Sequence, residues 1–445
     1  MKTPIFDFLS AYRDSGTRRF HMPGHKGRSF LGIEGLDITE VAGADVLTAA
    51  EGIIHESECY TSELYDTEHT FFCTEGSTLA IKAMLKLATE GVTGTPTVLA
   101  GRNAHRAFIS AAGLIGIDVE WIYPEESSHI SVCTISDEAV RSMLERRQNM
   151  PAAVYITSPD YLGNIADIEG ISRVCDEFSV PLLVDNAHGA YLGFLSPSRH
   201  PIALGAAMCA DSAHKTLPAL TGGAYLHISK KYPHYARGAR GALSLFSSTS
   251  PSYLTLASLD LCNKYLTEGY RKRLEDKIRK TEEIKRALAH IGLTVPESEP
   301  LKITLAPAGI GYTGTELAEL LRLSGIECEY SDGSYTVLMV STETADCELD
   351  YLLETVKKIP KRAPKNVPAA TFCSTRPLRA MSIREAIFAK SEEIPPSLSL
   401  GRICASPTVS CPPAIPIAVS GEIIDEATVK LMLSLGMDKI SVIKQ

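Results

Sequence analysis

Three short segments carry residues whose chemistry could combine at one site. Asp185 ends the apolar run PLLVD, and a carboxylate there can stabilise a protonated heterocyclic nitrogen. Lys215, in ADSAHKTLPALTGG, carries an amine that can form an imine with an aldehyde. Gly76, Ser77 and Thr78, in CTEGSTLAIKAML, stand at the start of a predicted helix. The free N–H groups and the dipole of such a helix start favour a phosphate.

Each segment taken alone has a commoner structural explanation. Asp185 could cap a turn, Lys215 could be an exposed loop lysine, and the hydroxyls before the helix could be simple capping residues. Taken together, in this order and on one sheet, the three segments indicate a single site. It would contain a phosphate-binding turn, an acid that pairs with a ring nitrogen and a lysine that forms an imine. Ser212 and His214 flank Lys215 and add hydrogen-bonding groups suited to the phosphate.

The elements that must position these residues alternate between apolar strands and helices from about residue 60 to 230. Continuous apolar runs are typical of parallel strands buried on both faces, and such sheets place ligands at strand C-terminal ends. The pattern predicts strands at 97–100, 119–123, 153–157, 182–185 and 224–228. It predicts helices at 78–90, 106–116, 137–148 and 168–178.

A chain of 445 residues exceeds what one hydrophobic core usually holds, so we expect more than one domain. We predict an N-terminal arm with few regular elements at 1–50 and a large α/β domain with a mostly parallel sheet at 51–292. A smaller α+β domain at 293–360 and a C-terminal section at 361–445 follow. We expect a helical segment at 264–291 to link the large domain to the smaller α+β domain, and 359–368 is predicted to be a linker.

The composition restricts the function classes. A net charge of −9 and an isoelectric point near 5.8 argue against a nucleic-acid binder. No run reaches the length of a membrane helix, and the N-terminus lacks the apolar core of a signal peptide. The 11 cysteines form no CxxC pair. We therefore expect a cytoplasmic protein with reduced thiols, no metal site, and no nucleic-acid or membrane partner.

The motifs, in their order, resemble the short form of the ornithine/lysine/arginine decarboxylase family, within the fold-type I pyridoxal-phosphate enzymes. The resemblance is strong from about 20 to 260 and returns near the end. It is carried by HMPGHKG, GLDITE, GADVLT, TEGST, GRNAHRA, TSPDYLGNIADI, DNAHGAYLGF, SAHKTLPALTGGAYLHI and GRICASPTVSCPPAIPIAVSGE. It implies the fold-type I transferase-like fold and pyridoxal 5'-phosphate as cofactor.

The family's site residues are assigned to the positions of this chain that match the family's motifs. Lys215 resembles the lysine that binds the cofactor aldehyde, and Asp185 resembles the acid that pairs with the pyridinium nitrogen. His105 resembles the histidine stacked on the cofactor ring, and the resemblance implies that Ala187 would lie on the other ring face and His188 near the substrate carboxylate. The predicted catalytic residues are Lys215, Asp185, His188 and His105. The predicted cofactor-binding residues are Gly76, Ser77, Thr78, His105, Asp185, Ala187, Ser212, His214 and Lys215.

Three departures from the family pattern affect the substrate more than the cofactor. Asn186 replaces the usual glutamate of DEAHG, and Ala213 replaces a hydroxyl residue next to the lysine motif. Ser406 stands where the family has a glutamate that could contact a cationic substrate. The closing motif at 410–414, Ser-Cys-Pro-Pro-Ala, also differs from the family's.

The resemblance predicts decarboxylation of arginine, lysine or ornithine to the amine and CO2 in polyamine metabolism. Arginine is favoured because short forms of the family often act in polyamine synthesis. A homodimer or larger homo-oligomer is expected, with the arm around 21–27 reaching a neighbour. Two alternatives are an aminotransferase or lyase of the same fold, and a non-catalytic regulatory homologue. The arginines considered for an aminotransferase are Arg376, Arg379, Arg384 and Arg402. A nicotinamide enzyme is disfavoured because no GxGxxG follows an early strand.

Overall fold

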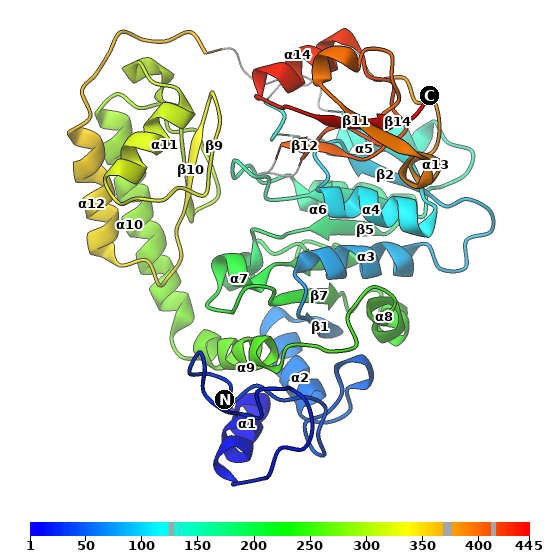
Figure 1. Ribbon diagram of the computed structural model, residues 1–445, viewed down its shortest axis with the longest axis vertical. Helices are drawn as coiled ribbons and strands as arrows, with labels where there is room; N and C mark the ends of the chain where they lie inside the picture. The colour runs from blue at the N-terminus through cyan, green and yellow to red at the C-terminus, as the bar shows by residue number, and fades with distance from the viewer. Residues whose placement is uncertain (124–128, 133, 368–375, 411–414) are drawn as a thin grey trace. The chain divides into compact units, whose positions relative to one another are not determined.

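The computed structural model describes residues 1–123, 129–132, 134–367, 376–410 and 415–445. The chain forms two compact units, each built from two separate stretches of sequence (Figure 1). The first unit contains Met1–Gly91 and Ile168–Leu274, and the second contains Val92–Asp167 and Glu275–Gln445. Pro368 of the predicted linker and 411–414 of the closing motif lie outside the described residues, as do cysteines 133 and 373.

The first unit contains strands flanked by helices. Its four strands lie in the order β1-β7-β6-β5, and β5 and β6 are parallel whereas β7 is antiparallel to both β6 and β1. Every residue of β5, β6 and β7 is buried, as expected of strands that are covered on both faces. The elements are α1 (Pro4–Asp14), α2 (Ile53–Tyr65), β1 (His69–Cys73), α3 (Ser77–Ala88), α6 (Ile168–Glu177), β5 (Leu182–Asp185), β6 (Met208–Asp211), α7 (Ala213–Thr216), β7 (Ala224–Ile228), α8 (His234–Ser244) and α9 (Tyr253–Thr267).

The N-terminal segment is more regular than its Gly-rich sequence predicts. Helix α1 buries Ile5 and Leu9, which lie one helical turn apart, and its first turn contains a proline. The carboxylate of Asp260 in α9 accepts hydrogen bonds from the backbone N–H groups of Ile5 and Phe6, both at 2.9 Å. The sequence pattern did not predict helix α1 within the arm at 1–50. The cap is supplied from a distant helix, so no local sequence signal marks it.

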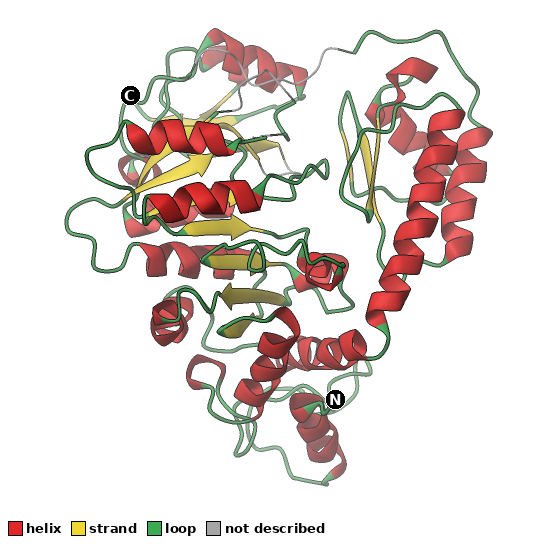
Figure 2. Cartoon of the chain, turned by 180° about the vertical axis from the view of Figure 1, so that it is seen from behind, coloured by secondary structure: helices red, strands yellow, loops and turns green. Residues whose placement is uncertain are grey.

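Among the described residues, the second unit contains part of the parallel sheet, a three-stranded antiparallel sheet and two short antiparallel strand pairs. Strand β2 pairs in parallel with both β3 and β4, so their order is β4-β2-β3. A separate antiparallel sheet has the order β8-β10-β9, and Figure 2 shows it beside helices of the same unit. The earlier elements are β2 (Thr97–Gly101), α4 (Arg106–Ile115), β3 (Asp118–Ile122), α5 (Asp137–Glu145) and β4 (Ala153–Thr157).

The later part of the second unit forms the predicted α+β region and the C-terminal section. Salt bridges of Lys277 with Asp346 and of Lys280 with Asp350 join helices α10 and α12. The elements are α10 (Tyr270–His290), which begins in the first unit, β8 (Lys302–Leu305), α11 (Gly314–Leu323), β9 (Tyr330–Ser331), β10 (Thr336–Met339), α12 (Asp346–Lys357), α13 (Ile383–Phe388), β11 (Ser391–Ile394), β12 (Thr408–Ser410), β13 (Ile415–Ala418), α14 (Glu426–Ser434) and β14 (Ile440–Ile443).

The helical segment expected over 264–291 is two helices. Helix α9 ends at Thr267, and α10 begins at Tyr270. Gly269 between them has φ +74°, a left-handed conformation that interrupts a helix and suits glycine. Apolar spacing alone did not reveal this break.

The fold class predicted from the sequence is confirmed as α/β with a mostly parallel sheet and a smaller α+β region. In the described part of the chain, no helix combines the length and apolar character needed to cross a bilayer. Among the residues that the structure describes, the free cysteines are Cys59, Cys73, Cys175, Cys209, Cys262, Cys328, Cys347 and Cys404.

Candidate active site

The start of α3 is shaped to receive an anion. The helix follows β1 and the turn at Gly76, and no side chain caps its first N–H groups. Ser77 at its first position accepts a hydrogen bond from Ser212 Oγ at 2.9 Å. The backbone N–H of Gly76 donates to the carbonyl of Gly222 at 2.8 Å. Two predicted phosphate residues, Ser77 and Ser212, thus lie together.

The loop at Gly222 approaches the turn before α3 too closely for any side chain. Gly222 has φ +94°, and a Cβ there would lie 2.6 Å from the carbonyl oxygen of Thr74. Position 222 therefore requires a glycine, because the loop before β7 lies against the turn that precedes α3. Gly222, in the GG pair that ends the segment ADSAHKTLPALTGG, thus allows these two backbones to come together.

Lys215 lies on the short helix α7, which follows β6. Its Nζ is 3.1 Å from Nε2 of His188, which is buried after β5. An amine and an imidazole at this separation can share one proton, because either nitrogen can accept what the other donates. Two predicted catalytic residues, 27 positions apart in the sequence, are therefore in contact.

His214 precedes Lys215 and faces the glycine loop. Its Nδ1 donates to the carbonyl of Gly223 at 2.9 Å, because a carbonyl can only accept. Burial lowers the pKa of His214, which favours the neutral ring with a bare Nε2. Contact with a phosphate would require a proton on Nε2, so a bound anion would raise this pKa again.

Asp185 is the last residue of β5 and is 2% exposed. Its Oδ1 accepts from the backbone N–H of Ala187 at 3.2 Å, which orients the carboxylate at the strand end. Ala187 itself is half-buried. The side chain thus occupies the place at a strand C-terminus where sheets of this class bind ligands.

Asn186 joins a buried polar network that the sequence did not predict. Its Nδ2 donates to Oδ1 of Asp211 at 2.7 Å. His200 and His227 contact the other oxygen of Asp211 through their Nε2 atoms, at 3.0 and 3.2 Å. Burial opposes ionisation, but the two imidazoles hold the pKa of the Asp211 carboxyl well below its usual range. Asn186 therefore donates to a buried carboxylate, a role that a glutamate could not fill.

His105 belongs to the second unit, unlike the other predicted site residues. It is the N-cap of α4, and its Nδ1 accepts from the backbone N–H of Ala107 at 3.2 Å. The ring is half-buried. This contact fixes the ring orientation, and the stacking role of His105 stays a prediction.

Comparison with known proteins identifies the family to which the chain belongs. The model of a protein family described as "Orn/Lys/Arg decarboxylase, major domain" matches residues 3–308. The chain belongs to this family. It is thus a pyridoxal-phosphate-dependent amino-acid decarboxylase, as the resemblance predicted.

Two relatives named arginine decarboxylase match nearly the whole chain. An arginine decarboxylase of Halalkalibacterium halodurans is 30% identical, over 96% of this chain and 92% of that protein. One from Bacillus subtilis is 29% identical, over 96% and 92%. The fold resembles that of a lysine decarboxylase from Francisella novicida, with a TM-score of 0.83 and 18% identity, covering 99% of this chain and 81% of that one.

The residues of the first unit fit the family's cofactor. The uncapped start of α3 offers N–H groups to a phosphate, and Lys215 offers an amine to an aldehyde. Asp185 offers a buried carboxylate to a ring nitrogen. These three groups are all within the same compact unit.

Proposed function

We propose that this chain uses pyridoxal 5'-phosphate to decarboxylate a basic amino acid, with arginine as the preferred substrate. The observation that carries the proposal is the contact between Lys215 and His188 in the unit that also holds Asp185 and the start of α3. The choice of arginine is supported by relatives of 28–30% identity that are named arginine decarboxylases.

Each residue would hold one part of the cofactor. Lys215 would bind the aldehyde through Nζ, and Asp185 would keep the ring nitrogen protonated, because a nearby carboxylate favours the cationic ring. Ser77, Thr78 and Ser212 would bind the phosphate at the start of α3. When bound, the cofactor supplies an electron-accepting ring for the electron pair left when CO2 departs.

The chain's own contribution to the reaction is to orient groups and move protons. His188 is 5% exposed and Lys215 is half-buried, so the proton that they share is partly shielded from solvent. That pair can return a proton to the substrate Cα after the carboxylate has left, through either Nζ or Nε2. Shielding from water also strengthens the electrostatic interactions among these groups.

The arginines considered for an aminotransferase already have structural contacts in the second unit. Arg379 pairs with Asp118, Arg402 pairs with Glu392, and Arg384 donates to backbone carbonyls of α4. The guanidinium of Arg376 lies over the ring of Tyr123. These contacts favour decarboxylation over transamination, which needs an arginine for the substrate carboxylate.

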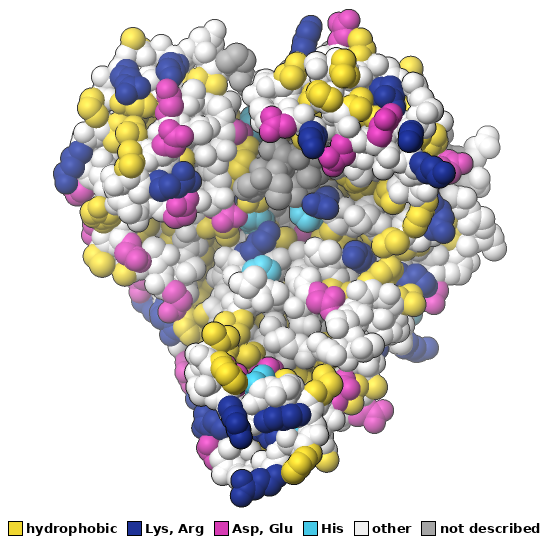
Figure 3. Space-filling model, viewed as in Figure 1, with side chains coloured by type: hydrophobic (Ala, Val, Ile, Leu, Met, Phe, Trp, Pro, Cys, Tyr) yellow, Lys and Arg dark blue, Asp and Glu magenta, His cyan; other side chains and the backbone are white. Residues whose placement is uncertain are grey.

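A homodimer is the assembly that we propose. The N-terminal segment exposes several large apolar side chains, including Phe20, Phe30 and Leu31, which are 96%, 77% and 85% exposed. Figure 3 shows hydrophobic and basic side chains together on this end of the first unit. Exposed apolar groups in such numbers are typical of an interface. We also propose a cytoplasmic location and a role in polyamine synthesis, which an amine product would suit.

A substrate and trapping assay tests the proposal. Purified protein supplied with pyridoxal phosphate is incubated with arginine, lysine or ornithine, and CO2, amine and keto acid are measured. We expect CO2 and amine in equal amounts, with the highest kcat/KM for arginine. Borohydride should attach the cofactor to the peptide that contains Lys215. Keto acid without CO2 would establish an aminotransferase instead, and no turnover of any of the three would favour a regulatory homologue.

Two lysine variants sharpen the test. Lys215→Ala should lower kcat/KM by at least about 10³-fold, because it removes a group that acts directly in the chemistry. Lys264→Ala removes an exposed lysine from α9 in the same unit and should leave activity unchanged. A Lys215→Ala enzyme as active as its parent would overturn the proposal.

A further inference from the structure

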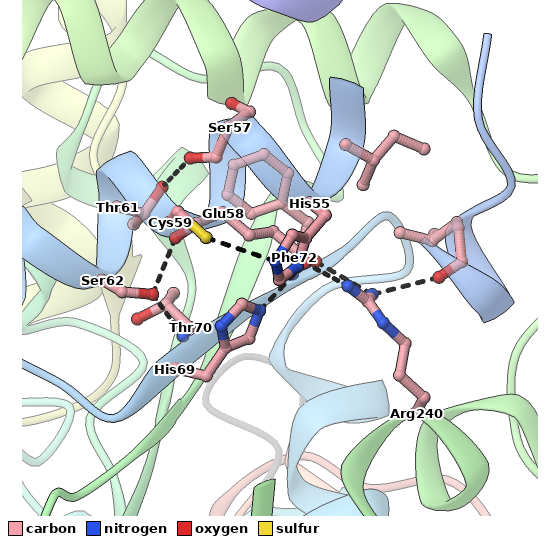
Figure 4. A network of polar contacts seen from close by, with 12 residues as sticks. His55, Ser57, Glu58, Cys59, Thr61, Ser62, His69, Thr70, Phe72 and Arg240 are labelled. Carbon is pink, nitrogen blue, oxygen red and sulfur yellow. Dashed lines mark hydrogen bonds and ion pairs between the residues drawn. The ribbon is translucent and has the colours of Figure 1, made fainter. Parts of the chain in front are cut away.

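A second cluster of chemically active side chains lies outside the candidate active site, between α2 and β1. His55 and Cys59 are four residues apart on α2, so they lie on one face of the helix. His69 is the first residue of β1. One ligand atom from each of the three lies within 4.8 Å of the others. Figure 4 shows the three side chains converging from the helix and the strand.

The spacing of these atoms suits a metal ion. Nε2 of His55 is 3.5 Å from Sγ of Cys59. Zinc bonds of about 2.0 Å to nitrogen and 2.3 Å to sulfur at a tetrahedral angle place those two atoms about 3.5 Å apart. The rings of His55 and His69 are stacked, with centroids 5.2 Å apart and planes 14° apart. A small movement of these rings would bring a nitrogen of each to the ion.

The residue beside Cys59 supplies the supporting carboxylate that metal-bound histidines usually have. Oε2 of Glu58 accepts from Nε2 of His69 at 3.2 Å. Glu58 is fully buried and is held in turn by the guanidinium of Arg240 and the backbone N–H of Phe72. His69 is therefore oriented by a carboxylate that is itself held by further contacts, which Figure 4 marks with dashed lines.

The cluster is accessible to an ion from solvent. His55 is exposed, and Cys59 and His69 are half-buried. Three protein ligands leave one tetrahedral position for water.

We propose that His55, Cys59 and His69 bind a zinc ion that clamps helix α2 to strand β1. The sequence predicted no metal site because the cysteines form no CxxC pair. The ligands meet only because the turn after α2 folds the start of β1 back onto the helix. Since β1 leads to Gly76 and the start of α3, the ion would stabilise the strand from which the proposed phosphate site begins.

Metal titration of the full-length protein tests this inference. Protein freed of metal by chelator is titrated with Co²⁺, an open-shell substitute for Zn²⁺. We expect a thiolate-to-cobalt charge-transfer band in the near ultraviolet that saturates at one equivalent and disappears when Zn²⁺ is added. Calorimetry of the same protein should give one Zn²⁺ per chain. Absence of the charge-transfer band would overturn the proposal.

Variants identify the ligands. Cys59→Ser should abolish the charge-transfer band, and Cys59→Ser and His55→Ala should each weaken Zn²⁺ binding by more than about 10-fold, the least that changes around such sites cost. Cys347→Ser removes an exposed cysteine from α12 and should change neither reading. A band that persists in Cys59→Ser, or equal Zn²⁺ affinity in all variants, would refute the assignment.

Alkylation provides a measurement on the unmutated chain. Zn²⁺ should slow the reaction of Cys59 with iodoacetamide by at least about 10-fold, since a bound thiolate is a poorer nucleophile, and should leave Cys347 unaffected. Equal rates at Cys59 with and without Zn²⁺ would also count against the site. Neither cysteine belongs to the proposed active site. The result of the decarboxylase assay and the result of the zinc experiments can therefore be told apart.

Discussion

Replacing Asn186 by Asp would show how strongly the buried network around Asp211 depends on charge. Asn186 Nδ2 lies 2.7 Å from Asp211 Oδ1, and both residues are 0% exposed. Asp has the same size as Asn but replaces the N–H donor by a carboxylate oxygen. The variant therefore places two carboxylates face to face without solvent, while His200 and His227 still contact Asp211.

Asn186→Asp lowers the free energy of unfolding because the new side chain must take up a proton when the protein folds. Two carboxylates at this distance in a buried site do not both ionise, and the imidazoles favour the charge on Asp211. Asp at 186 is therefore protonated when folded and ionised when unfolded, where its pKa is about 3.9. Keeping it protonated costs about 1.36 kcal/mol per pH unit above that value, or about 1.5 kcal/mol at pH 5 and about 4 kcal/mol at pH 7.

The sign of the pH dependence distinguishes this mechanism from a simple packing defect. The folded pKa is raised above the unfolded one, so the penalty is absent below about pH 4 and grows as pH rises. Urea unfolding followed by circular dichroism at pH 5 and pH 7 measures it. Asn149→Asp adds the same charge at an exposed position and should change the free energy of unfolding by less than about 0.5 kcal/mol. An equal loss for Asn186→Asp at both pH values would refute the reasoning.

Two further predictions concern a buried ion pair and the assembly. Glu299 and Lys302 form a pair at 2.8 Å with side chains 2% and 1% exposed, so Glu299→Gln should cost about 3–5 kcal/mol in urea unfolding. Adding Lys302→Met should recover part of that loss, and no recovery would contradict the buried-charge explanation. Sedimentation equilibrium should find a dimer whose dissociation constant rises at least about 10-fold in Phe30→Ser/Leu31→Ser, as for residues central to an interface. A monomeric parent protein would contradict the proposed assembly.

The fold could be predicted where burial alone determines the sequence of a strand. Strands β4, β5 and β7 have the predicted bounds because each is a continuous apolar run between polar turns. Strands β1 and β6 were missed. β1 begins with His69 and Thr70, whose polar side chains contact other buried polar groups. β6 has only four residues and ends in Asp211. In both, polar residues in contact with distant partners hid the strand.

The candidate site could be predicted in part, because strand ends and lysine chemistry are visible in the sequence. The rule that ligands gather at strand C-terminal ends anticipated the positions of Asp185 and Lys215. The Asp211 network could not be found in this way. His227 reaches Asp211 only because β6 and β7 pair in a particular antiparallel register, with Cys209 opposite His227. Sequence motifs are read along the chain, whereas this network forms across strands.

The pairing of β1 with β7 has a consequence for synthesis of the chain. His69 pairs with Ile228, which follows it by 159 positions. At about 5–20 residues per second, the ribosome needs roughly 8–30 s to deliver the partner of β1. Throughout that interval the segment HTFFC, with Phe71 and Phe72, has no native strand beside it. The newly made chain should therefore recruit a chaperone to this segment until residue 228 has left the exit tunnel.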